Sequence, residues 1–307
     1  MDLNEIPKSA SEITAEWMTN ALDLENNNHV SEIKVEGMAE GVGFMGEVAR
    51  LHLKFSDGIE KTLISKIPTQ DPNIRAMLAP ARVFEREARF FEQAQPLIPD
   101  ITANCLHVAI DTKNDDYLLL LEDLSDMREG DQLNGCSVDD ASSALEALAK
   151  LHSTFWGGKD LASFDWLPDI NNDGMKVGRE VYAQSLPGFL EAFGSSVDPE
   201  NESLVQRFGE NVYQLLDRLA AMPLTVCHMD YRADNLFFAS DGSVKMIDFQ
   251  TFSRHGHAED VGYFISQNMS IEDRRNNEND LLRTYHEALT AGGIDYSFDQ
   301  LREDYRI

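Results

Sequence analysis

The sequence has few cysteines and no long apolar run. Its three cysteines, Cys105, Cys136 and Cys227, lie far apart and form no C-x-x-C pair, which excludes a disulfide scaffold and favours buried thiols in a reducing compartment. No stretch approaches the roughly eighteen apolar residues of a membrane-spanning helix, and residues 1–20 are too polar for a signal peptide. We therefore expect a cytoplasmic protein without a membrane partner.

Positive charge is also scarce. The chain of 307 residues carries 26 Lys and Arg against 54 Asp and Glu, a formal net charge of −28. Because nucleic acids and anionic membranes are bound through clusters of Lys and Arg, this balance excludes both as partners. The acidic excess is explained either by a strongly solvated surface, the simpler reading, or by attraction of a cationic ligand such as an amine or an aminoglycoside.

One loop and one turn in the C-terminal half carry the strongest functional signal. The run 228–235 reads H-x-D-x-x-x-x-N, with Asp230 and Asn235 at its fixed positions, and Asp248 follows thirteen residues later in an I-D-F-Q turn. This pattern is typical of ATP-dependent phosphotransferases. Asp230 would take or orient the proton of an acceptor hydroxyl, while Asn235 and Asp248 offer the hard oxygen ligands that Mg²⁺ prefers.

The spacing between these residues has a local cause. A short apolar strand and an Asp-Gly turn signal follow Asn235, and a return strand at 244–247 ends at Asp248. A two-stranded ribbon would bring Asn235 and Asp248 to neighbouring points, where one metal ion can bridge them. The structural alternative is an ordinary hairpin preceded by a polar loop.

A glycine-rich segment lies far upstream. Gly41, Gly43 and Gly46 fit G-x-G-x-x-G, in which backbone N–H groups approach phosphate closely. A dinucleotide-binding fold would place a helix directly after it, whereas residues 48–55 and 62–67 both read as strands. A glycine hairpin that covers phosphates is the kinase arrangement.

Lys66, on the second of these strands, is the candidate for the lysine that contacts the α- and β-phosphates. A helix expected from Ala79 to Gln95 carries Glu87, which is placed to reach back to Lys66 and fix its position. Glu85 is the alternative partner, and a solvated charged helix face is the purely structural explanation.

A buried strand and a hinge should follow. Residues 117–121 form a continuous apolar run, after which the composition turns polar. The backbone groups around Glu122 and Leu124 would then read the edge of an adenine base.

These elements, in this order, resemble the aminoglycoside phosphotransferase and choline kinase group, the small-molecule branch of the protein-kinase-like fold. The H-M-D at 228–230 and the I-D-F-Q at 247–250 are most similar to the ecdysteroid kinase-like proteins and their bacterial relatives. The resemblance extends from about Gly41 to Asp260. It implies an α+β, bilobal fold with a small β-rich N-lobe at 1–121 that contains one key helix, a hinge at 122–126, and a larger, mainly helical C-lobe at 127–307.

The resemblance also implies the roles of individual residues. Asp230 is the catalytic base, Asp260 braces the catalytic loop, and Arg232 lies either near the transferring phosphate or in a surface salt bridge. The remaining roles are Mg²⁺ ligation by Asn235 and Asp248, a phosphate-lysine pair of Lys66 and Glu87, and covering of ATP by Gly41, Gly43 and Gly46.

Departures from the protein kinase pattern narrow the substrate. Gln250 stands where protein kinases have the glycine of D-F-G, only eleven residues separate Asp248 from Asp260, and no A-P-E follows. The chain therefore lacks room for an activation segment, and a folded protein is not the expected substrate. His255 and His257 are only a weak metal-binding pair, because no further ligands accompany them.

The helical part offers less about chemistry. A capping signal at Ser137 starts a helix whose apolar stripe ends near His152, which we expect to be a core histidine. An aromatic set between 155 and 195 either lines a pocket for an apolar, sterol-like alcohol or belongs to the core; it comprises Trp156, Phe164, Trp166, Tyr182, Phe189 and Phe193. The last residues, 301–307, read as part of a helix, so we expect the natural chain to continue.

The function predicted from the sequence is transfer of the γ-phosphate of ATP, with Mg²⁺, to a hydroxyl of a small molecule. The acceptor is either apolar and sterol-like or similar to an aminoglycoside. The competing hypothesis is a catalytically silent protein that binds a nucleotide as a switch. Retention of Lys66, Asp230, Asn235 and Asp248 together speaks against the switch, because degenerate kinases usually lack at least one of them.

Overall fold

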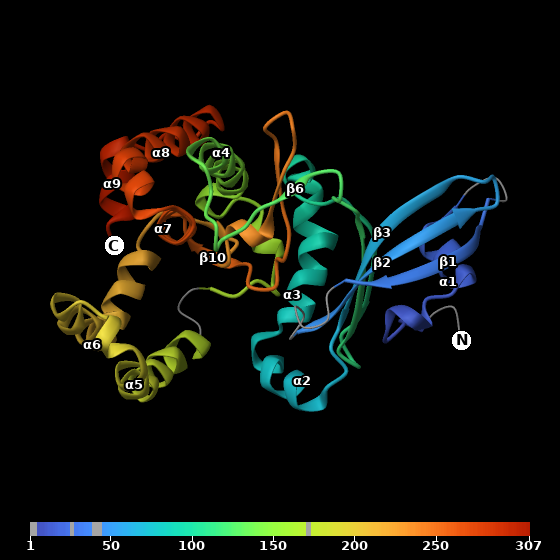
Figure 1. Ribbon diagram of the computed structural model, residues 1–307, viewed down its shortest axis with the longest axis horizontal. Helices are drawn as coiled ribbons and strands as arrows, with labels where there is room; N and C mark the ends of the chain where they lie inside the picture. Colours follow the sequence, from blue (N-terminus) through green and yellow to red (C-terminus); the bar gives the residue numbers. More distant parts are fainter. Residues whose placement is uncertain (1–4, 25–27, 39–44, 170–172) are drawn as a thin grey trace.

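An antiparallel sheet forms most of the N-terminal part of the chain. The computed structural model describes residues 5–24, 28–38, 45–169 and 173–307. Within them the five strands of this sheet follow the order β1-β2-β3-β5-β4 (Figure 1). Their bounds are Val30–Gly37 for β1, Gly46–Phe55 for β2, Glu60–Pro68 for β3, Cys105–Asp111 for β4 and Asp116–Glu122 for β5. The predicted strands at 48–55, 62–67 and 117–121 are therefore confirmed.

Strand β5 is buried on both faces of this sheet. Leu118 and Leu120 pack with α1 (Ala15–Ala21) on one face, whereas Leu119 and Leu121 belong to the main core on the other. Side chains of a strand point alternately to opposite faces, so a continuous apolar run is what a doubly covered strand requires.

The helix that carries Glu87 is shorter than predicted. Arg82 adopts a left-handed conformation with φ of 50°, and this kink separates a first helical segment from the helix of interest. Helix α3 spans Val83–Arg89 and continues as a π-helical turn over Phe90–Ala94. The single helix expected from Ala79 to Gln95 is thus wrong at its start, since a left-handed residue cannot continue a right-handed helix. The preceding segment is α2 (Pro72–Leu78).

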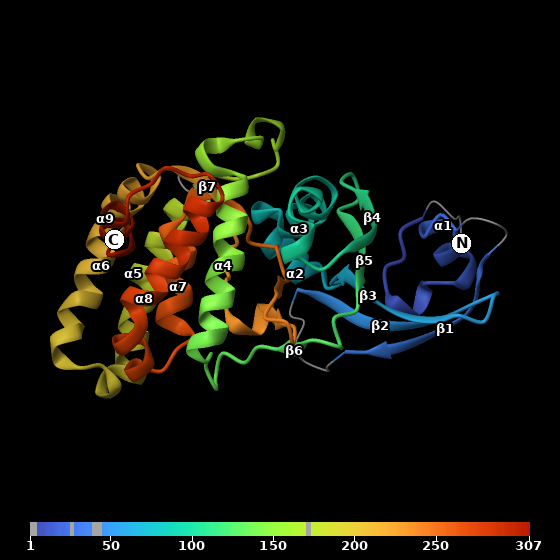
Figure 2. The same cartoon turned by 90° about the horizontal axis from the view of Figure 1, so that it is seen from above.

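Helices dominate the C-terminal part, and α4 and α8 lie side by side in its core (Figures 1 and 2). Helices α5 and α6 stand at the end of the molecule far from the N-terminal sheet (Figure 1). The helices are α4 (Val138–Thr154), α5 (Asp173–Phe193), α6 (Pro199–Ala220), α7 (Ala258–Gln267), α8 (Ile271–Ala291) and α9 (Phe298–Tyr305). Ser137 caps α4 by accepting the N–H of Asp140 at 3.1 Å, which confirms the predicted start.

Two small sheets lie among these helices. Their strands flank the loop at 228–235 and the turn at Asp248. One pairs β7 with β10, and the other has the order β6-β8-β9. Their bounds are Arg128–Glu129 for β6, Leu224–Cys227 for β7, Leu236–Phe238 for β8, Val244–Met246 for β9 and Ser253–Gly256 for β10. Short 3₁₀ turns complete the fold at Ala10–Glu12, Ala79–Ala81, Gln95–Leu97, Pro99–Ile101, Trp156–Gly158, Leu161–Ser163, Gly194–Ser196 and Ala233–Asn235.

The aromatic set between 155 and 195 does not gather around one pocket. Phe164 and Trp166 are buried in the main core, whereas Phe189 and Phe193 lie exposed on α5. Tyr182 contacts Phe208 instead. Among the helices that the structure describes, none is both long and apolar enough to cross a membrane.

Replacement of Leu118 by alanine tests the contribution of the doubly covered strand. Leu118 is fully buried, so Leu118→Ala should lower the free energy of unfolding by about 2–5 kcal/mol, through lost transfer energy and the cavity left behind. Urea unfolding measures this. Leu133→Ala is the control, because Leu133 is 99% exposed and its loss should change stability by less than about 0.5 kcal/mol. Equal effects of the two variants would contradict the assigned core.

Candidate active site

Lys66 lies between two carboxylates from different parts of the chain. Its Nζ is 2.7 Å from Oε1 of Glu87 on α3 and 2.8 Å from Oδ1 of Asp248, which follows β9. Glu87 is buried, while the alternative partner, Glu85, pairs with Arg82 at 2.8 Å on the outer side of the helix. The predicted ion pair of Lys66 and Glu87 is therefore present, and Asp248 joins it.

This arrangement favours the charged forms of Lys66 and Asp248, whereas burial raises the pKa of Glu87. Burial by itself lowers the pKa of Lys66, but the Glu87 and Asp248 carboxylates outweigh it, so the pKa of Lys66 is raised. Burial likewise opposes ionisation of Asp248, yet the Lys66 ammonium outweighs it and lowers the pKa of Asp248. A lysine that stays charged and a carboxylate that stays ionised suit contact with phosphate and a divalent cation, respectively.

One buried aspartate accepts hydrogen bonds from the backbone of the loop that contains Asp230. Asp260, at the start of α7, accepts the backbone N–H of His228 at 2.6 Å and that of Met229 at 2.9 Å. Met229 has φ of 68°, a conformation that costs a bulky residue energy and persists only where the surroundings impose it. The bracing predicted for Asp260 is confirmed by these two hydrogen bonds.

The β8–β9 ribbon brings Asn235 and Asp248 to the same end. Leu236 pairs with Met246, and the N–H of Ile247 donates to the carbonyl of Asn235 at 3.0 Å. The Asn235 amide donates to the Asp230 carbonyl at 2.8 Å and to Oδ2 of Asp230 at 3.0 Å, which leaves its own oxygen for another partner. Asp248 uses Oδ1 for Lys66 and keeps Oδ2. Two hard oxygen donors from one ribbon end fit a magnesium ion.

An aromatic stack connects the turn of Asp248 to the helix of Glu87. Phe249 lies parallel to Phe90, with ring centroids 3.6 Å apart and an interplanar angle of 9°. Asp248 itself has φ of 65°, which aspartate tolerates better than most residues. The stack and the left-handed turn together point the carboxylate of Asp248 toward Lys66, while Phe249 stays in the core.

The structure places the remaining predicted residues as follows. Arg232 is 3.4 Å from Asp230 and 3.3 Å from Asp234, so its side chain pairs with two acids of its own loop. Glu122 ends β5, and its backbone N–H donates to the carbonyl of Asn104. Its backbone carbonyl is therefore the group that could contact an adenine base. Among the described residues no hydrogen bond uses the N–H of Leu124. Gly41 and Gly43 lie outside the described residues.

Gly46 is described and is required for a steric reason. A Cβ at this position would lie 2.5 Å from the carbonyl oxygen of Ile67 on the neighbouring strand. The strand that leaves the glycine-rich segment thus passes close to β3, next to Lys66, which pairs with Val48. Only glycine permits this approach.

Three contacts at the site were not predicted. Gln250 lies near Glu87 and acts to lower its pKa, Lys245 pairs with Glu122 at 2.7 Å, and the phenol of Tyr263 donates to Oδ1 of Asp230 at 3.3 Å. The replacement of the D-F-G glycine by Gln250 was a visible signal. Tyr263 offered none except its position one helical turn after Asp260.

The buried histidines of the C-terminal part are structural. His152 contacts the Tyr285 hydroxyl at 2.7 Å and Asp260 at 3.4 Å, which confirms it as a satisfied core residue. His152, Asp260 and Cys227 form the one cluster of three potential metal ligands among the described residues. Asp260 already accepts two backbone hydrogen bonds there, so the cluster is explained without a metal.

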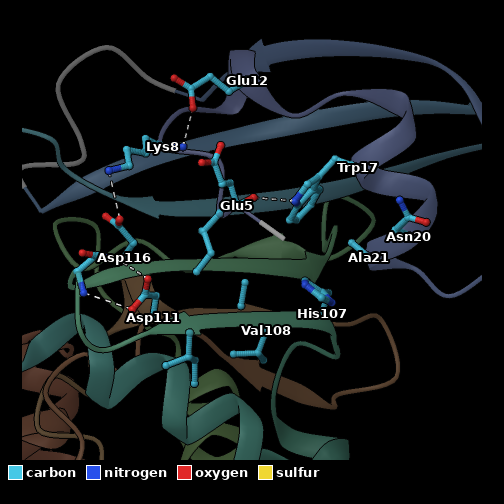
Figure 3. Close-up of a pocket in the computed structure, with 14 residues that line it drawn as sticks. Glu5, Lys8, Glu12, Trp17, Asn20, Ala21, His107, Val108, Asp111 and Asp116 are labelled. Carbon is cyan, nitrogen blue, oxygen red and sulfur yellow. Dashed lines mark hydrogen bonds and ion pairs between the residues drawn. The ribbon is translucent and has the colours of Figure 1, made fainter. Parts of the chain in front are cut away.

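One cavity of the structure lies away from the predicted site residues. It has a volume of about 790 Å³ and lies between the N-terminal segment and the outer strand β4 (Figure 3). Trp17 and His107 meet at one end, and the ion pair of Lys8 with Asp116 lies at the other (Figure 3). None of the predicted site residues lines it.

Comparison with known proteins agrees with this geometry. The model of the ecdysteroid kinase-like family matches residues 40–293. A solved aminoglycoside-3′-phosphotransferase of type VIII is 17% identical, with a TM-score of 0.51 over 89% of this chain and 93% of that one. Choline kinase from Cryptosporidium parvum Iowa II is 11% identical, with a TM-score of 0.57 over 90% and 79%. A spectinomycin phosphotransferase in complex with ADP and spectinomycin is 14% identical, with a TM-score of 0.53 over 96% and 84%.

The fold and the family together define a small-molecule kinase. The structural likenesses show a protein-kinase-like, α+β fold with a β-rich N-terminal part and a helical C-terminal part, as predicted. No curated protein matches the sequence. Because the family model covers most of the length, the chain belongs to the ecdysteroid kinase-like family.

His257 should make stability depend on pH. It is fully buried among Trp156, Tyr285 and Tyr296, and neither ring nitrogen has a hydrogen-bond partner within the described structure. Burial, with a smaller effect of His152, lowers the pKa of His257 from 6.5 to about 3. Its contribution to stability is therefore complete above pH 6.5 and is lost as pH falls toward 3, because the unfolded chain takes up the proton.

The variant His257→Phe tests this, because phenylalanine is apolar and does not titrate. Urea unfolding between pH 7 and pH 4 should show a shallower loss of stability in the variant than in the wild type, by up to about 1.4 kcal/mol per pH unit. Parallel pH profiles for the two proteins would show that His257 is not held neutral.

Proposed function

We propose that the protein transfers the γ-phosphoryl group of ATP, bound with Mg²⁺, to a hydroxyl group of a small molecule. The observation that carries the proposal is the position of Lys66 between Glu87 and Asp248, next to the ribbon end of Asn235. Phosphoryl transfer depends mainly on positioning and on stabilising charge, and these residues supply both.

Each residue has a distinct part in the proposed reaction. Lys66 contacts the α- and β-phosphates and is oriented by Glu87. Asn235 and Asp248 would hold Mg²⁺, which neutralises charge on the phosphate oxygens when bound. Asp230 accepts the proton of the acceptor hydroxyl, and Arg232, 3.4 Å from Asp230, would face the transferred phosphate.

The nucleotide site is proposed along the edge of the N-terminal sheet. The carbonyl of Glu122 and the N–H of Leu124 would face the adenine base, and Gly41, Gly43 and Gly46 would cover the phosphates. The corresponding division of the chain is an N-lobe at 1–121, a hinge at 122–126 and a C-lobe at 127–307. Strand β5 ends at Glu122, which supports the position of the hinge.

The acceptor is proposed to be a small molecule, either an apolar, sterol-like alcohol or an amine-bearing one. The similar structures include an aminoglycoside phosphotransferase and a choline kinase, which supports a small-molecule acceptor. The net charge of −28 is compatible with a cationic acceptor. Three free thiols fit a reducing compartment and thus a cytoplasmic location.

The function is tested with γ-labelled ATP, Mg²⁺ and a fractionated small-molecule extract, followed by mass spectrometry of newly phosphorylated compounds. A labelled product identifies the acceptor class. Nucleotide binding without labelled product, across extracts and hydroxyl libraries, would instead support the nucleotide-switch hypothesis.

Replacement of the proposed base should separate chemistry from binding. Asp230→Asn keeps the size of the side chain but removes its basicity, so turnover should fall by about 10²–10⁴-fold while ATP affinity is preserved. Steady-state rates and binding of a fluorescent ATP analogue measure the two effects. Near-normal turnover would remove Asp230 from the role of base.

Replacement of the proposed metal ligand should act on nucleotide binding. Asp248→Ala removes a carboxylate that would hold Mg²⁺, so the affinity for ATP should lose its dependence on Mg²⁺ concentration. Titration of the fluorescent ATP analogue at several Mg²⁺ concentrations measures this. Asp241→Ala is the control, because Asp241 is an exposed turn residue outside the site. An unchanged Mg²⁺ dependence in Asp248→Ala would refute the assignment.

A further inference from the structure

The two oxygens of the Asp230 carboxylate have different surroundings. Oδ2 accepts the amide of Asn235 at 3.0 Å and lies 3.4 Å from Nε of Arg232, both from the catalytic loop itself. Oδ1 accepts the phenol of Tyr263 at 3.3 Å, and no other side chain among the described residues hydrogen-bonds it. A carboxylate oxygen accepts two hydrogen bonds, so Oδ1 keeps one lone pair for an incoming hydroxyl.

Tyr263 reaches Asp230 because of its place on α7. Asp260 and Tyr263 are three residues apart, so both lie on the face of the helix that meets the catalytic loop. Asp260 fixes the backbone at His228 and Met229, and Tyr263 fixes the carboxylate at the next residue. One helical turn thus positions both the main chain and the side chain of the proposed base.

The phenol of Tyr263 is suited to remain protonated and to donate a hydrogen bond. Burial raises the pKa of Tyr263, and the adjacent Asp230 carboxylate raises it further, so the hydroxyl keeps its proton. The phenol is half-buried, and its oxygen lies 3.3 Å from Oδ1 of Asp230.

We propose that Tyr263 is a positioning residue that holds Asp230 so that Oδ1 faces the acceptor. The proposal rests on the phosphotransferase function above. In the reaction, the acceptor oxygen forms a bond to the γ-phosphorus and its proton passes to Oδ1 of Asp230. The bond from that phosphorus to the β–γ bridging oxygen breaks, and ADP leaves. Tyr263 transfers no proton and acts only through Asp230.

The test is a double-mutant cycle with Tyr263→Phe, Asp230→Ala and the double variant. The probe is γ-labelled ATP with Mg²⁺ and water as acceptor, followed by release of labelled phosphate. Tyr263→Phe should lower the rate about tenfold, the loss expected for one hydrogen bond to a charged group, without changing the affinity for a fluorescent ATP analogue. In the Asp230→Ala background the same change should have no further effect.

Ser266→Ala, one turn further along α7, is the matched control and should leave the rate unchanged. Ser266 is exposed and bonds only the backbone of the helix. Equal slowing by Tyr263→Phe in both backgrounds would show a general structural role and overturn the proposal. So would an unchanged rate in the single variant.

Unfolding in urea separates failure of this inference from failure of the proposed function. A wild-type protein that neither binds Mg²⁺ with ATP nor releases phosphate would overturn both. If phosphate is released, the stabilities of the same four proteins should show coupling between Tyr263 and Asp230, because the hydrogen bond is lost only once. Additive stabilities would show that the contact is absent in solution and would overturn the positioning role alone.

Discussion

The site depends on one buried cation held between two carboxylates. Lys66 comes from the N-terminal sheet, Glu87 from the helix beside it, and Asp248 from a turn in the C-terminal part. Removal of Lys66 would leave both carboxylates without their cation in a largely buried place, at a cost of about 3–5 kcal/mol. The ion pairs therefore connect the two parts of the chain, and the rest of the site is arranged around them.

Packing of aromatic rings makes that arrangement specific. Phe249 follows Asp248 and stacks on Phe90, which continues the helix of Glu87. Asp248 thus directly precedes one ring of the stack, and Glu87 lies one helical turn before the other. Because buried rings pack in few orientations, a shift of the helix would move the turn with it. The positions of the two carboxylates are coupled through the core as well as through the cation.

Helix α7 gives the catalytic loop a comparable support from the other side. Asp260 satisfies two N–H groups of a loop whose Met229 is left-handed, a strain of about 1–3 kcal/mol that the loop would otherwise relieve. His152 and Tyr285 extend this network into the helical core. The buried polar residues of the C-terminal part therefore serve to hold a strained loop, which is consistent with a kinase whose base must stay aligned with a phosphate.

The sequence by itself determined the features that depend on near neighbours. Strands β2, β3, β5, β8 and β9 follow from apolar patterning and turn residues, and the ribbon places Asn235 beside Asp248 through short-range pairing. Tertiary structure decided what depends on distant contacts. The packing of α3 buries Glu87 and leaves Glu85 to pair with Arg82, and the aromatic set near α5 divides between core and surface. Tyr263 meets Asp230 only because α7 packs under the loop, a contact across 33 residues that no local pattern records.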